Sequence, residues 1–146
     1  MLAPWLELPG VRDHVTALGD AAGLDLLSRA QETRPIVVVD DIRAVLGPIS
    51  AEIYGHPTRE LTVIGVTGTS GKTTTSYLLE AGLLHAGHSV GLIGTTGTRI
   101  NRTPVPTSLT TPEAPTLQEL FARMKSEGVT HVVMEVSSHA LELGRV

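Results

Sequence analysis

A lysine followed by three threonines stands at the point where an apolar stretch gives way to a helical pattern. Residues 61–66 form a β-branched and apolar run that is typical of a buried strand, and residues 67–71 are small. Beyond them the apolar residues recur at helical spacing, at Tyr77, Leu78, Ala81 and Leu84. A strand, a glycine-containing loop and a helix in this order predict a phosphate-binding loop, because the N–H groups and the dipole of the helix start attract an anion.

The residue types in this loop also predict which groups of a nucleotide complex they bind. Lys72 is expected to contact the β- and γ-phosphates of a nucleotide as a catalytic residue, and the Thr73 hydroxyl is expected to bind Mg²⁺. The general motif has a glycine where this chain has Val66, and the alternative interpretation is an ordinary turn between a strand and a helix. We assign phosphate binding to eight consecutive residues: Gly68, Thr69, Ser70, Gly71, Lys72, Thr73, Thr74 and Thr75.

A second group of polar residues comes at the end of the apolar stretch 130–136. Glu135 is placed as in a strand that delivers a carboxylate to a phosphate-bound Mg²⁺, although an acid at a strand end is also common without such a role. Ser137 is either a helix cap or a substrate contact, and Arg145 is either an anion partner or a surface arginine. A hydrolase that pairs a serine with His139 is disfavoured, because neighbours in sequence seldom form a nucleophile–base pair.

The elements that must position these residues alternate between strand and helix. Further strands are expected at residues 88–94 and 130–136, and a hairpin is expected at 97–108 around Asn101-Arg102. A helix is expected at residues 116–125, with Pro112 and Glu113 in its first turn. This order predicts an α/β fold with a mostly parallel sheet of the P-loop type, covered on both faces. Ligands of such sheets bind beyond the carboxyl ends of the strands, where the loop and Glu135 both lie.

The first part of the chain predicts a separate, smaller α/β unit. An apolar strand is expected at residues 35–40, followed by a helix that Gly47-Pro48 interrupts. Residues 54–57, which read Tyr-Gly-His-Pro, are expected to interrupt the secondary structure before the phosphate-binding loop. We therefore predict a domain boundary here, between residues 1–59 and residues 60–146.

Composition excludes several classes of partner. The 146 residues carry a net charge of −4, so neither a nucleic acid nor an anionic membrane is an expected partner. The chain has no cysteine, which is compatible with a reducing cytoplasm, and no apolar run approaches the ~20 residues of a membrane span. We expect a cytoplasmic protein without a signal peptide or membrane insertion, and the sequence leaves the oligomeric state open.

Three blocks of sequence resemble one family. They are residues 66–75, the segment Leu109-Thr-Thr-Pro112, and residues 134–141, which read Met-Glu-Val-Ser-Ser-His-Ala-Leu. Together they resemble the Mur ligases, whose shortened glycine spacing explains why Val66 replaces the first glycine. Folylpolyglutamate synthases share that loop, but the other two blocks favour the Mur ligase that adds the third residue of the peptide. The resemblance extends over residues 36–146.

The resemblance implies a fold, a reaction and a set of site residues. It implies part of a UDP-recognition domain followed by part of a central ATP-binding domain. The implied activity is an ATP-dependent amide-bond ligase that joins meso-diaminopimelate or L-lysine to UDP-MurNAc-L-Ala-D-Glu through an acyl phosphate. Thr110, Thr111, Ser137 and Arg145 would hold the nucleotide-linked dipeptide, Thr73 and Glu135 would hold Mg²⁺, and Glu113 and His139 would lie near the metal.

Other interpretations remain open at this point. Mur ligases are several-fold longer than this chain and have three domains, so we expect an incomplete chain with doubtful activity of its own. A remnant that binds nucleotide without ligation is one alternative, and a relative of folylpolyglutamate synthases is another. A kinase or simple ATPase is disfavoured, because apart from Glu135 the sequence offers no residue that resembles the usual water-positioning or base residues.

Overall fold

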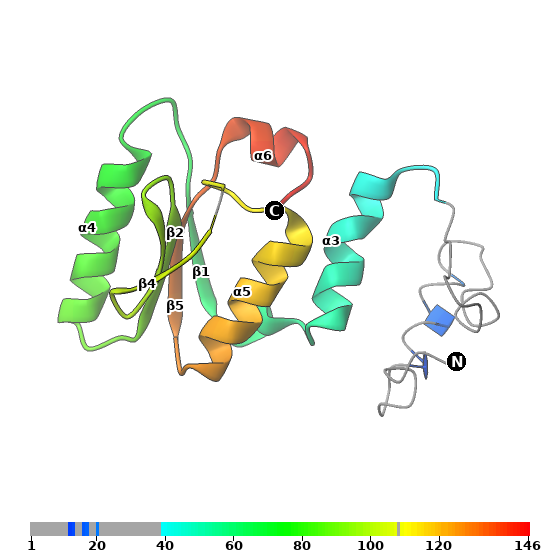
Figure 1. Cartoon of the computed structure of the whole chain (residues 1–146), viewed down its shortest axis with the longest axis horizontal. Helices are drawn as coiled ribbons and strands as arrows, with labels where there is room; N and C mark the ends of the chain where they lie inside the picture. Colours follow the sequence, from blue (N-terminus) through cyan, green and yellow to red (C-terminus); the bar gives the residue numbers. More distant parts are fainter. Residues whose placement is uncertain (1–11, 14–15, 18–19, 21–38, 108) are drawn as a thin grey trace. The chain divides into compact units, whose positions relative to one another are not determined.

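A computed structural model of the chain describes residues 12, 13, 16, 17, 20, 39–107 and 109–146 (Figure 1). The chain divides into two compact units, Met1–Ile42 and Arg43–Val146, and the second contains the sheet. The strand expected at 35–40 lies mostly outside the described residues, and Val39 and Asp40 are not in a strand. The predicted domain division at residues 59 and 60 stays a prediction. No helix in the described part of the chain is long and apolar enough to cross a bilayer.

Helix α3 (Ile42–Ile53) and the short 3₁₀ helix η2 (Pro57–Arg59) precede the sheet. The expected interruption of the helix at Gly47-Pro48 is wrong, because α3 continues through both residues. Pro48 is exposed, so its ring does not have to fit a packed surface. The side chains of Val45, Leu46 and Ile49 are half-buried on this helix.

Five strands form one mixed sheet in the order β1-β5-β2-β3-β4. Strands β1 (Thr62–Val66), β5 (His131–Glu135) and β2 (Val90–Gly94) are parallel to one another. Strands β3 (Gly97–Ile100) and β4 (Thr103–Val105) are antiparallel and form the predicted hairpin, which turns at Asn101 and Arg102. The predicted α/β fold with a mostly parallel sheet is confirmed.

The parallel strands are connected by helices that cover opposite faces of the sheet (Figure 1). Helix α4 (Lys72–His85) packs its Leu79, Leu83 and Leu84 side chains on Val90, Leu92 and Val133. Helix α5 (Ala114–Ser126) packs on the other face, where its Leu117, Leu120, Phe121 and Met124 join Ile93, Val132 and Met134. Adjacent strand residues alternate between the two clusters, as the period of two in a strand requires. A last helix, α6 (Ser138–Glu142), follows β5 directly.

Three details differ from the sequence-based expectation. Strand β1 lies at the edge of the sheet with only β5 beside it, so Val63 is 37% exposed rather than buried. Helix α4 packs the predicted Tyr77 and Leu84 on the sheet, but it turns Ser76 and Glu80 inward and leaves Ala81 and Leu78, which is 69% exposed, on its outer side. Helix α5 begins at Ala114, so that Glu113 is its N-cap residue and Pro112 precedes the helix.

Candidate phosphate-binding site

The predicted loop joins β1 to α4 and is exposed. Gly68 and Gly71 have φ values of 141° and 80°, which only glycine adopts readily, and Gly71 is the N-cap of α4. No side chain caps this helix end, so its first N–H groups are available to an anion. The Lys72 Nζ donates to the Gly68 carbonyl oxygen at 2.6 Å, which places the ammonium group over the loop.

Glu135 meets this loop from the end of β5. Its side chain is buried, with 1% of the residue exposed, and the Thr73 hydroxyl donates to Oε2 at 3.0 Å. The structure therefore brings together the two residues that the sequence predicted as Mg²⁺ ligands, 62 positions apart. Donating this proton leaves the Thr73 oxygen two lone pairs for a metal ion. Hydroxyl and carboxylate oxygens are the ligand type that Mg²⁺ prefers, so the donor set fits the ion.

Thr95, which was not among the predicted site residues, holds the same carboxylate. Its backbone N–H donates to Glu135 Oε1 at 3.0 Å, and its hydroxyl donates to Oε2 at 3.0 Å. Three hydrogen bonds thus offset the burial of Glu135 and fix the plane of the carboxylate. The only available signal was the position of Thr95, at the carboxyl end of a parallel strand. Thr110 lies next to this group, because its hydroxyl donates to Thr95 Oγ1 at 3.3 Å.

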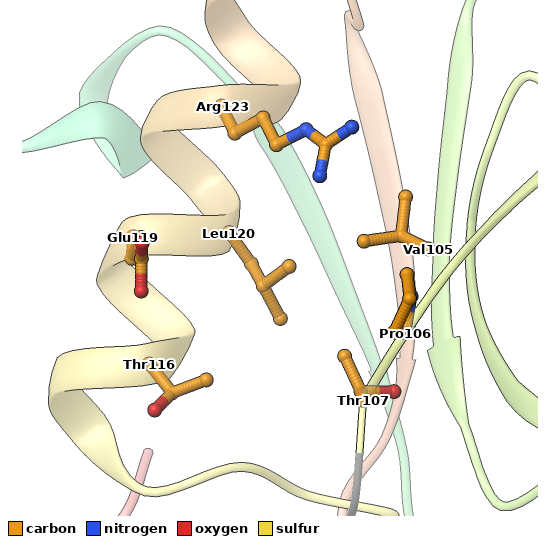
Figure 2. Close-up of a pocket in the computed structure, with 7 residues that line it drawn as sticks. All are labelled: Val105, Pro106, Thr107, Thr116, Glu119, Leu120 and Arg123. Atoms are coloured by element: carbon orange, nitrogen blue, oxygen red, sulfur yellow. The ribbon is translucent and has the colours of Figure 1, made fainter.

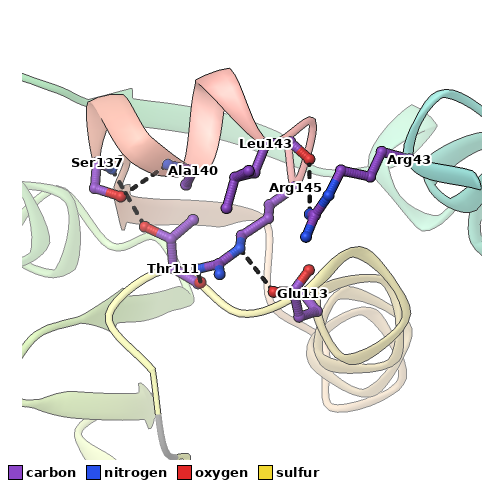
Figure 3. A network of polar contacts seen from close by, with 7 residues as sticks. All are labelled: Arg43, Thr111, Glu113, Ser137, Ala140, Leu143 and Arg145. Carbon is purple, nitrogen blue, oxygen red and sulfur yellow. Dashed lines mark hydrogen bonds and ion pairs between the residues drawn. The ribbon is translucent and has the colours of Figure 1, made fainter. Parts of the chain in front are cut away.

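Three of the predicted substrate residues belong to one polar network beside α6 (Figure 3). The Thr111 hydroxyl donates to the Glu135 carbonyl oxygen at 2.9 Å and accepts from the Ser137 N–H at 3.3 Å. The Ser137 Oγ accepts from the Ala140 N–H at 3.1 Å and so caps α6. Thr111 is buried with its hydroxyl engaged by backbone groups, so its observed role is to fix the end of β5. Substrate contact by Thr111 stays a prediction.

Arg145 connects this network to the start of α5. Its Nη1 donates to the Thr111 carbonyl oxygen at 3.4 Å, and its Nε lies 2.8 Å from Glu113 Oε1 as an ion pair without hydrogen-bond geometry. Arg43 of α3 donates to the Leu143 carbonyl oxygen at 3.2 Å, next to Arg145 (Figure 3). The anion partner of Arg145 in the described structure is therefore a carboxylate of this chain.

The remaining predicted metal residues are placed differently from Thr73 and Glu135. Glu113 pairs with Arg145, and His139 is exposed on α6. Among the described residues, no three His, Asp or Glu side chains are grouped closely enough to hold a metal ion. A role of Glu113 or His139 near the metal stays a prediction.

A groove of about 560 Å³ lies between α5 and the segment after β4 (Figure 2). It is lined by Val105, Pro106, Thr107, Thr116, Glu119, Leu120 and Arg123. None of the predicted site residues lines this groove. The candidate phosphate-binding site is therefore distinct from it.

The fold and the loop define a class of protein. Residues 66–146 match the model of the Mur ligase middle domain, which is more than half of the chain. The chain therefore belongs to the Mur ligase family.

The chain is also similar in sequence to individual proteins. The chain is 66% identical over 157 aligned positions to the UDP-N-acetylmuramoyl-L-alanyl-D-glutamate–2,6-diaminopimelate ligase of Corynebacterium glutamicum, covering 99% of this chain and 30% of that protein. It is 51% identical over 156 positions to the ligase of the same name from Streptomyces avermitilis, covering 97% of this chain and 30% of the relative. The chain thus spans about 30% of the length of these relatives.

A solved structure of a UDP-N-acetylmuramoyl-L-alanyl-D-glutamate–2,6-diaminopimelate ligase has a similar fold. The TM-score is 0.60 at 32% sequence identity, and the match covers 69% of this chain and 21% of that one. The similarity therefore extends from the sequence motifs to the arrangement of strands and helices.

Proposed function

We propose that this chain is part of an ATP-dependent ligase that joins diaminopimelate to UDP-MurNAc-L-Ala-D-Glu in peptidoglycan synthesis. The contact between the Thr73 hydroxyl and the Glu135 carboxylate supports the proposal, because it joins the candidate phosphate-binding loop to the acid expected to bind Mg²⁺. The names of the relatives favour diaminopimelate over L-lysine as the amino acid. A cytoplasmic location is part of the same proposal.

The chemical difficulty of this reaction is negative charge. A carboxylate of the dipeptide must approach the triphosphate, accept the γ-phosphoryl group and form an acyl phosphate, which the amine then attacks. Lys72 and the free N–H groups at the start of α4 would bind the phosphates and stabilise the charge that develops. Thr73 and Glu135 would hold Mg²⁺, which supplies a further positive charge beside the transferred group.

The dipeptide substrate would bind along the carboxyl ends of β5 and β2. Thr110 and Ser137 expose polar groups near Glu135, and Arg145 supplies a cation there. Since Glu113 neutralises Arg145 in the described structure, a substrate carboxylate would compete with Glu113 for the guanidinium group.

The decisive test is a substitution of Lys72 in an active ligase. We suggest a chimera in which this chain replaces the matching segment of the Corynebacterium glutamicum relative. Wild-type chimera should release phosphate only when ATP, the UDP-linked dipeptide and diaminopimelate are all present. Lys72→Ala should lower kcat by about 10²- to 10³-fold, because a preorganised charge at the transferred phosphoryl group is lost.

A second lysine variant, away from the candidate site, controls for the loss of one positive charge from the protein. Lys125 lies on α5, where it is 39% exposed and pairs with Glu60. Lys125→Ala should leave turnover unchanged. Normal turnover by the Lys72→Ala chimera would show that the phosphate site is assigned to the wrong loop. Calorimetry of the chimera with ATP and Mg²⁺ tests binding separately, and binding of ATP by a chimera that does not turn over would favour the non-catalytic alternative.

A further inference from the structure

The turn between β2 and β3 has contacts on two sides. Thr95 donates from its N–H and its hydroxyl to the two oxygens of Glu135 on β5. The next residue, Thr96, shares a hydrogen bond of 2.5 Å between its hydroxyl and the hydroxyl of Tyr77 on α4. Adjacent residues of one turn thus contact the metal-binding carboxylate and the helix that starts at the phosphate loop.

The backbone of this turn places its positive φ after the two threonines. Thr95 and Thr96 are not among the described non-glycine residues with positive φ, whereas Gly97 has a φ of 107°. A turn followed by such a glycine is a common hairpin form, so the backbone can reverse the chain here by itself. The hydrogen bonds to Glu135 and Tyr77 add to this local preference and hold the two threonines in place.

Tyr77 is itself held by a charged pair. The guanidinium group of Arg99 on β3 lies 4.3 Å from the centre of the Tyr77 ring, and its Nη2 contacts Glu80 Oε2. Glu80 is one turn after Tyr77 on α4 and is 4% exposed. We refer to Tyr77, Glu80, Thr96 and Arg99 as the turn clamp.

The ion pair of the turn clamp is poorly suited to stabilising the fold. Glu80 Oε1 and Arg99 Nε are both buried without a hydrogen-bond partner. A buried ion pair gains stability only when its remaining donors and acceptors are satisfied, and apolar residues often replace such a pair without loss. The pair is better explained by the position that it gives to Tyr77 than by a gain in stability.

We propose that the turn clamp is a positioning device for the Mg²⁺ site. It holds Thr96 against α4, which fixes Thr95, and Thr95 fixes both oxygens of the Glu135 carboxylate. This inference rests on the proposed function, because it assumes that Thr73 and Glu135 bind the metal of a metal–nucleotide complex. Its consequence is that residues of α4 and β3 without any contact to nucleotide or metal control how strongly Mg²⁺ promotes nucleotide binding.

Calorimetry can measure directly how strongly Mg²⁺ promotes nucleotide binding. A non-hydrolysable ATP analogue is titrated into the full-length chimera by calorimetry, once with Mg²⁺ and once with EDTA, and the ratio of the two affinities is the Mg²⁺ enhancement. Tyr77→Phe removes only the hydroxyl that bonds Thr96. It should lower the enhancement by about three- to tenfold, which corresponds to one hydrogen bond, while affinity in EDTA stays unchanged.

Two further variants separate positioning from stability. The double variant Glu80→Met and Arg99→Met should keep or raise the melting temperature and still lower the enhancement, which a purely structural pair would not do. Tyr54→Phe is the matched control, since it removes the hydroxyl of the other tyrosine, at the end of α3, and should change neither quantity.

The outcomes distinguish this inference from the proposed function. If the wild type binds the analogue more tightly with Mg²⁺, and both the Tyr77→Phe and the double variant keep its full enhancement, the turn clamp has no positioning role. If the wild type binds the analogue equally well with Mg²⁺ and EDTA, the inference is overturned while the phosphate site stands. If the wild type binds no nucleotide at all, the proposed function fails and the inference fails with it.

Discussion

The two turns of the β2-β3-β4 meander have the same length but place their positive-φ residues differently. At the second turn, Asn101 and Arg102 have φ values of 47° and 70°, the left-handed pair of a twisted two-residue hairpin. The Asn101 side chain also accepts from the Val90 N–H and the Ser89 hydroxyl. At the first turn the positive φ of 107° belongs to Gly97, after the two threonines, and the threonines hydrogen-bond Glu135 and Tyr77.

The difference follows from what each turn positions. The second turn reverses the chain and holds it against the start of β2 through Asn101. The first turn presents an N–H and a hydroxyl to a buried carboxylate. Because its two threonines contact α4 and β5, changes in either element reach the candidate metal site.

The largest effect is expected from adding a methyl group to Gly94, the last residue of β2 before the first turn, where the backbone lies close to Glu135. A Cβ atom at Gly94 would lie in forbidden contact with Glu135 Oε1, and 3.1 Å from its Cδ. Gly94→Ala should therefore lower the free energy of unfolding by about 3 kcal/mol and abolish the Mg²⁺ enhancement. Urea unfolding and calorimetry measure the two effects.

Gly82→Ala on α4 is the matched control for the added methyl group. Its Cβ would meet nothing within 4 Å, so stability should rise by about 0.5 to 1 kcal/mol through helix propensity. An unchanged Mg²⁺ enhancement in Gly94→Ala would contradict the close packing of β2 on the carboxylate.

A smaller effect on stability, and none on the metal site, is expected at the second turn. Asn101→Ala removes the acceptor of the Val90 N–H, which is buried, and places alanine at a left-handed φ. The free energy of unfolding should fall by about 2 kcal/mol. The Mg²⁺ enhancement should equal that of the wild type, and a lower value would mean that the two turns are coupled.

The smallest effect is expected at Arg102. Arginine at φ 70° is strained, whereas glycine adopts this conformation at little cost. Arg102→Gly should raise the free energy of unfolding by less than about 1 kcal/mol, again without a change in Mg²⁺ enhancement. A destabilised Arg102→Gly variant would show that the arginine side chain has a contact that outweighs the strain.

Much of the fold was predictable because its signals are local. The apolar runs at β2 and β5, the Asn101-Arg102 turn and the glycines after α4 and α5 all act through their own backbone. The position of β1 was not predictable in this way. An apolar run reads the same in a central strand and in an edge strand, and only the strand order leaves Val63 exposed.

The buried face of α4 shows a second limit of sequence patterns. Periodicity favoured Tyr77, Leu78, Ala81 and Leu84. Tyr77 and Leu84 pack on the sheet, but Leu78 and Ala81 are exposed, and the helix buries Ser76 and Glu80 instead. Glu80 is buried because Arg99, on a strand 19 positions away, supplies its counter-charge. No pattern within the helix reports a partner on another element.

The candidate site also divides into features with local sequence signals and contacts that only the tertiary structure forms. The sequence alone predicted the phosphate-binding loop, since its glycines, Lys72 and Thr73 stand together in the chain, and it determined that Glu135 ends a strand. Only the tertiary structure decided that Thr73 and Thr95 meet on that carboxylate and that Tyr77 and Thr96 meet beside it. The physical reason is that a hydrogen bond between distant residues depends on strand order and helix rotation, which the packing of the whole sheet sets.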